Sequence, residues 1–157
     1  MKTATVFEIK KELQHRDANT LMQLCLRLSK FKKENKELLT YLLFQADDEE
    51  GYVTAVKDDI SEAFATMNTD SYFYMKKSVR KILRNAKKHI RYSSKKETEV
   101  ELLLHFCQEL RALRPSIARN TTLQNLYQRQ LDFIEKKMGL LHEDLQYDYG
   151  LKLEALR

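Results

Sequence analysis

Apolar residues recur every three or four positions along most of this 157-residue chain, and that spacing predicts helices. A first helix near residues 3–14 places Val6, Ile9 and Leu13 on one face. Asp17 follows a short polar break and is expected to cap the start of a second helix. The apolar stripe of that second helix has a 3-4-3 spacing and comprises Leu21, Leu24, Leu28 and Phe31.

The middle of the chain continues the helical pattern. Residues 36–44 are apolar on all sides, which is typical of a central helix. A helix at 49–67 follows, with the acids of 47–50 at its positive end. Its apolar positions are Val53, Val56, Ile60, Phe64 and Met67. Asp70 is the expected N-cap of the fifth helix.

A sixth helix is predicted from the sequence SKKE, in which Ser94 and Glu97 have the spacing of a capping box. This helix is expected to extend to about Leu113, because Pro115 disfavours helical backbone at the residue before it.

A long seventh helix is predicted at 122–148, capped by Asn120 or Thr121. Its apolar seam steps by 4-3-4-3-4 and comprises Tyr127, Leu131, Ile134, Met138, Leu141 and Leu145. Gly139 lies inside this pattern, where it would be tolerated at a cost of about 1 kcal/mol. The seam is expected either to enter the core or to mediate homo-oligomerisation.

The composition supports the same fold class. The chain has only one Pro and three Gly, too few for the many tight turns of a β-rich fold. We therefore predict an all-α protein of about seven helices, with residues 1–157 forming one domain. Two segments, 36–44 and 100–107, share a faint likeness that suggests a HEAT-like stack of helix pairs. An irregular helical bundle is the alternative.

The segments KKENKELLTYLLFQADDEE and LHEDLQYDY are similar to sequences of short, uncharacterised all-helical bacterial proteins of the cytosol. This resemblance implies a cytosolic all-α domain. It implies no activity and assigns no site residues.

One segment is strongly basic: residues 75–96, MKKSVRKILRNAKKHIRYSSKK, contain ten Lys or Arg and no acid. On a helix that turns 100° per residue, the apolar residues of this region occupy an arc of about 100°. These are Tyr72, Met75, Val79, Ile82, Leu83, Ala86 and Ile90. Eight basic residues occupy an adjoining arc of about 140°. This basic stripe comprises Lys76, Lys77, Arg80, Lys81, Arg84, Lys87, Lys88 and Arg91.

Three interpretations of the basic stripe remain open. It can bind nucleic acid or another polyanion. Alternatively, it is only solvated or paired with the acidic helix at 47–62, and the protein acts through protein–protein contacts. An acidic protein partner is the third interpretation. The segment 75–96 carries +10 and the rest of the chain a net −5, from 18 bases and 23 acids, so the excess of acids elsewhere is too small to neutralise the segment.

The sequence contains few candidate catalytic or metal-binding residues. The densest polar cluster, at 142–148, contains His142, Asp144 and Asp148 and suggests a metal-dependent enzyme as an alternative function. On one helix, however, His142 and Asp144 would point about 160° apart. No phosphate-binding glycine loop, HExxH, CxxC or GxSxG motif occurs. The sequence thus predicts no catalytic residue, no metal ligand set and no cofactor.

The expected location is the cytoplasm. The first residues contain no apolar stretch of signal-peptide length, and no apolar run is long enough to span a membrane. Cys25 and Cys107 both lie in apolar helical segments, where a free thiol behaves as a small apolar side chain. The basic stripe and the absence of catalytic motifs together predict a macromolecular partner, either a nucleic acid or a protein.

Overall fold

The computed structural model describes all residues 1–157 and contains helices and no strand, which confirms the all-α prediction. The chain divides into two compact units, Met1–Phe44 (unit 1) and Gln45–Arg157 (unit 2). No helix is both long and apolar enough to cross a lipid bilayer.

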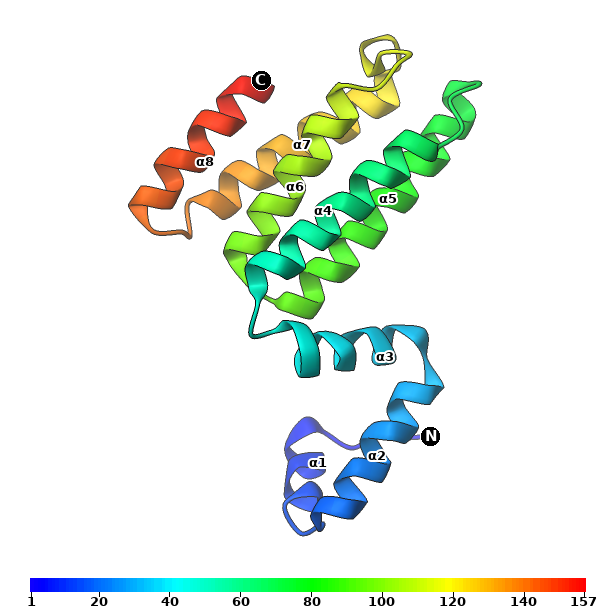
Figure 1. Ribbon diagram of the computed structural model, residues 1–157, viewed down its shortest axis with the longest axis vertical. Helices are drawn as coiled ribbons and strands as arrows, with labels where there is room; N and C mark the ends of the chain where they lie inside the picture. Colours follow the sequence, from blue (N-terminus) through cyan, green and yellow to red (C-terminus); the bar gives the residue numbers. More distant parts are fainter. The chain divides into compact units, whose positions relative to one another are not determined.

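Unit 1 contains three α-helices (Figure 1). Its elements are α1 (Val6–Leu13), α2 (Ala18–Phe31), α3 (Lys33–Thr40) and most of a π-helical turn, η1 (Tyr41–Gln45). Thr5 caps α1 in a capping box with Glu8. Asp17 caps α2 as predicted, because its Oδ1 accepts a hydrogen bond from the backbone N–H of Thr20 at 2.8 Å.

Unit 1 has almost no core, since Tyr41 is its one buried residue. No residue of α1, α2 or α3 is buried, although all three helices carry apolar side chains. The prediction that 36–44 is a central helix is wrong, since Leu42, Leu43 and Phe44 are all exposed. An apolar composition indicates that burial of a segment is favourable, but it does not show which other part of the protein or which partner buries it.

Unit 2 stacks five α-helices in two layers. They are α4 (Glu49–Thr66), α5 (Tyr72–Ser93), α6 (Lys96–Arg111), α7 (Thr121–Met138) and α8 (Glu143–Leu156), with a short 3-10 turn, η2 (Ile117–Arg119), before α7. Helices α4, α6 and α8 contact one another in series, whereas α5 and α7 pack against α6 from the other side. Figure 1 shows α4 lying along α5 and α6 lying along α7. A HEAT-like arrangement of these pairs stays a prediction.

The core of unit 2 centres on α6. Phe106 of α6 is fully buried, and its ring centroid lies 5.5 Å from that of Phe64 in α4. Leu102, Leu103 and Leu110 of α6 are buried with it. The apolar arc predicted for α5 also faces this core: six of its seven residues are buried, and Tyr72 is half-buried.

The predicted helix at 122–148 is two helices. The helix α7 ends at Met138, residues 139–142 form a turn, and His142 then caps α8 through its ring nitrogen. Four of the six predicted seam residues, Tyr127, Leu131, Ile134 and Met138, are buried in unit 2. Homo-oligomerisation through this region stays a prediction.

Two predicted caps are also wrong. Ser71, not Asp70, caps α5. Ser94 does not start α6 but ends α5 in a left-handed conformation with φ of 59°, and Lys95 precedes α6 without a side-chain cap. The helix α5 extends far enough to use Ser94 as its C-cap, which removes the capping box.

Candidate functional site

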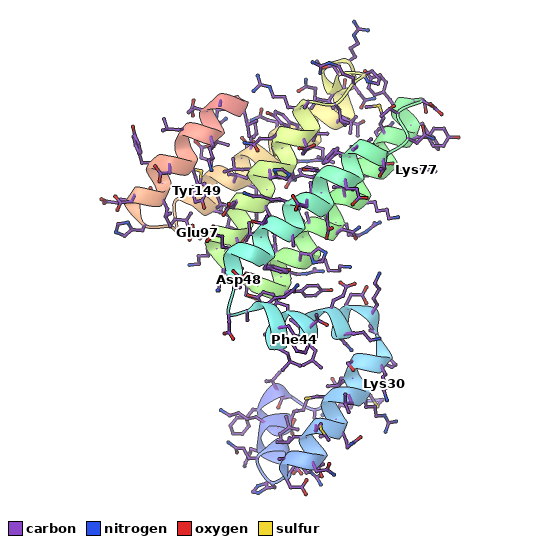
Figure 2. All side chains as sticks on the ribbon, viewed as in Figure 1. Lys30, Phe44, Asp48, Lys77, Glu97 and Tyr149 are labelled. Carbon is purple, nitrogen blue, oxygen red and sulfur yellow. The ribbon has the colours of Figure 1, made fainter.

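The basic stripe lies along one side of α5, with the apolar arc of the same helix against the core. Lys76 and Lys88 are half-buried. The other six side chains are exposed: Lys77, Arg80, Lys81, Arg84, Lys87 and Arg91. Figure 2 shows Lys77 near the amino-terminal end of α5. The stripe therefore presents cations over several helical turns to solvent.

The acids of the neighbouring helix α4 do not neutralise most of this stripe. Lys88 aside, no stripe residue forms an ion pair with a carboxylate. Glu49 instead accepts hydrogen bonds from Ser93 and Thr98 and pairs with Lys95. Asp58, Asp59 and Glu62, which also belong to α4, are exposed and form no ion pair. The pairing expected between the two helices is thus absent for seven of the eight cations.

A shallow depression of about 280 Å³ lies within the stripe. Arg80, Arg84, Lys87 and Arg91 surround it, and Leu83 contributes the apolar part of its wall. Beside it, on α7, the half-buried ring of Phe133 lies close to two lysines. The Nζ atoms of Lys87 and Lys137 are 5.9 and 5.2 Å from its centroid. This surface offers cations for phosphate groups and an aromatic face next to them.

Arg84 occupies the most repulsive position in the stripe. Arg80 and Lys88 lie one turn away at i−4 and i+4, while Lys81 and Lys87 lie at i−3 and i+3. Like charges at these spacings destabilise a helix by a few tenths of a kcal/mol each. We expect Arg84→Glu to raise the free energy of unfolding by about 1–2 kcal/mol, because four repulsions become attractions. Urea denaturation at low salt measures this change.

Arg129→Glu on α7 provides the control for Arg84→Glu. Arg129 is also exposed, but its i+3 neighbour is Asp132, so the new carboxylate should lower stability by a few tenths of a kcal/mol. Both effects should shrink in 1 M NaCl, where screening acts within about 3 Å. Equal effects of the two substitutions, or a gain unaffected by salt, would show that like-charge repulsion does not strain α5.

The cluster predicted for metal chemistry is only partly assembled. His142 Nδ1 and Asp144 Oδ2 lie 3.6 Å apart, and both side chains are exposed. Asp148 instead lines a separate groove described below. No group of three or more His, Cys, Asp or Glu side chains is placed to hold a metal ion.

A groove of about 880 Å³ that no sequence pattern predicted lies on the α4–α6–α8 layer. Five carboxylates line it, and those near Tyr149 have partners. The Tyr149 hydroxyl donates to Glu97 at 3.0 Å and to Glu101 at 3.3 Å, while Lys57 pairs with Glu101 at 2.6 Å. Burial and the two neighbouring carboxylates raise the pKa of Tyr149. These side chains come from three helices, so no local motif could have revealed the groove.

A second polar cluster joins α4 to α6. The Ser61 hydroxyl lies 2.7 Å from His105 Nε2 and donates to Glu109 at 3.2 Å. The pKa of His105 is lowered, because burial outweighs the attraction of Glu109. Glu109 also approaches Nε2, at 3.9 Å, so it does not orient the ring through Nδ1 as the acid of a nucleophilic triad does. The cluster links the two helices and lacks the geometry of a catalytic triad.

Comparison with known proteins supplies no relative. No protein-family model, curated protein or solved structure matches this chain.

Proposed function

We propose that this protein is a non-catalytic helical binding protein that binds single-stranded nucleic acid through the basic stripe of α5. The observation that carries the proposal is that seven stripe cations form no ion pair with a carboxylate. Their mutual repulsion opposes folding, and a chain of phosphates would relieve it. A HEAT-like stack of helix pairs would display such a stripe on one layer.

The neighbouring aromatic ring favours single strands over duplexes. Phe133 is half-buried, and its ring centroid lies within 6 Å of the Lys87 Nζ, so a base could stack on the accessible part of the ring while the phosphates contact the stripe. No motif for reading base pairs in a groove occurs in the sequence. Binding is therefore expected to depend on charge and stacking and to show little sequence preference.

Fluorescence anisotropy across a salt series tests the proposal. The wild-type protein is titrated against a labelled 20-nucleotide single strand and against the matching duplex, from 50 to 400 mM NaCl. If about five phosphates are neutralised, the logarithm of the binding constant should fall with the logarithm of salt concentration with a slope of about −3.5 for the single strand.

Two outcomes would overturn this assignment. Absence of micromolar binding at 50 mM NaCl would mean that the stripe is a solvated surface. Binding with a slope near zero would mean that any contact with nucleic acid does not involve release of counterions from phosphates.

A further inference from the structure

Unit 1 exposes an unusual number of large apolar side chains. They form the apolar surface of unit 1: Val6, Phe7, Ile9, Leu13, Met22, Leu24, Leu26, Leu28, Phe31, Leu38, Leu42, Leu43 and Phe44. Their exposed fractions together correspond to on the order of 1,000 Å². This summed area exceeds the roughly 800 Å² that each partner buries in a standard interface.

The apolar residues of α2 extend over more than one side of the helix. At 100° per residue, its apolar residues extend from Phe31 through Leu24 and Cys25 to Leu26, an arc of about 220°. A helix with so wide an apolar surface is typically enclosed by other helices. In unit 1 no residue of α2 is buried, so most of this arc lacks a partner.

This surface contains a groove between α1 and α2. It has a volume of about 240 Å³, and its apolar walls come from Ile9, Leu13 and Leu24. Glu8, Glu12 and Arg16 line its rim. A protruding apolar side chain of a partner could enter it, and the partner would meet charges of both signs around it.

These features favour a second copy of the chain over a membrane. Anionic lipid attracts a helix that has a cationic polar face, but the rim of this groove includes two carboxylates. A two-fold axis instead brings a surface against itself, so a rim with both signs of charge complements its own copy. Moreover, 44 residues are close to the length below which a chain usually needs association to build a core.

We propose that unit 1 is a homodimerisation module, in which the apolar surfaces of two copies pack together around α2. The proposal is independent of nucleic-acid binding, since it involves no residue of the basic stripe. It predicts a dimer of the 157-residue chain, with twice the monomer mass of 18.7 kDa.

Two measurements on the 157-residue chain test the dimer together. Sedimentation equilibrium gives the mass across a range of concentrations. In parallel, reaction with a thiol reagent reports on Cys25, which is exposed and lies near the middle of the apolar arc of α2. Cys107 does not interfere, because it is buried and burial raises its thiol pKa to about 12. At a total chain concentration 100 times the dissociation constant, Cys25 should react roughly fifteenfold more slowly, because mass action leaves only about 7% of the chains monomeric.

A matched pair of variants locates the interface. Leu28→Glu with Phe31→Glu alters side chains that are 61% and 78% exposed in unit 1 and should yield a monomer with fast-reacting Cys25. Leu140→Glu with Leu151→Glu alters side chains that are 57% and 59% exposed in unit 2 and should leave the dimer intact. Circular dichroism establishes that both variants stay helical.

Each alternative occupant gives a different result. A monomer whose Cys25 is protected at every concentration would mean that unit 1 is covered by its own chain. A monomer with reactive Cys25 that becomes protected only on vesicles of phosphatidylserine would assign the surface to a membrane. A dimer disrupted by the unit 2 pair but not by the unit 1 pair would place the interface elsewhere. Any of these results would overturn the proposal.

Discussion

Replacing Arg80, Arg84, Lys87 and Arg91 together with Glu should weaken binding of a single-stranded 20-mer by at least about 10³-fold at 100 mM NaCl. These four side chains surround the depression in the basic stripe. The substitution removes up to four phosphate contacts and places carboxylates where phosphates would bind. Any residual binding should have a salt slope smaller by about 3, because each lost contact with a single strand contributes about 0.7. Fluorescence anisotropy measures both quantities.

The fold should survive this quadruple substitution. Glu is a good helix former, and the new carboxylates at positions 80, 84 and 91 would each lie one helical turn from a remaining lysine of the stripe. The matched control reverses four exposed cations spread over the rest of the chain: Lys2, Lys96, Arg119 and Lys152. It makes the same change in net charge and should lower affinity less than tenfold, through long-range attraction alone. If both variants lose affinity equally, binding reflects net charge and α5 is not the site.

The stripe was predictable because α5 is long and uninterrupted. Over 22 residues without Gly or Pro, one helical period separates core positions from solvent positions, and the structure buries Met75, Val79 and Ile82 on the expected side. The sequence could not show whether acids of α4 reach the stripe. That depends on how the helices are rotated against one another, and Glu49 turned out to bond with residues at the start of α6 and the end of α5.

The break between α7 and α8 was not predictable from apolar spacing. The 4-3-4 pattern continues across residues 139–142, because both helices bury residues at heptad-like positions. Gly139 has ordinary right-handed helical angles, so it does not act as a left-handed stop. A local sign was present in His142, Glu143 and Asp144, since a helix start favours acids in its first turn.

Features that depend on several helices could not be predicted. The groove of the α4–α6–α8 layer brings Glu97, Glu101 and Tyr149 together across about fifty residues of sequence. Periodicity shows which side of a helix is apolar, but it does not show whether another helix of the chain covers that side. For this reason the segment 36–44 had the pattern of a core helix, although Leu42, Leu43 and Phe44 are exposed.

Truncating Phe106 to Ala should lower the free energy of unfolding of the protein by about 3–5 kcal/mol. Phe106 has no exposed surface, packs on Phe64 and lies in α6, which contacts all four other α-helices of unit 2. Its removal would leave a cavity that these helices cannot all close at once. Because domains of this size are stable by only about 5–15 kcal/mol, the variant should lose a large fraction of its stability. Urea denaturation followed by circular dichroism measures the loss.

Phe73→Ala controls for the loss of an aromatic ring. Phe73 lies in the first turn of α5, is largely exposed and contacts Tyr74 and Lys77, so its truncation should cost less than about 1 kcal/mol. The difference between the two losses in free energy of unfolding measures how much the buried Phe106 ring of α6 stabilises unit 2. If Phe106→Ala costs no more than Phe73→Ala, α6 is not the centre of the core. At a temperature where Phe106→Ala remains folded, its salt slope for single strands should equal that of the wild type, because the stripe needs a folded α5 and not the Phe106 ring itself.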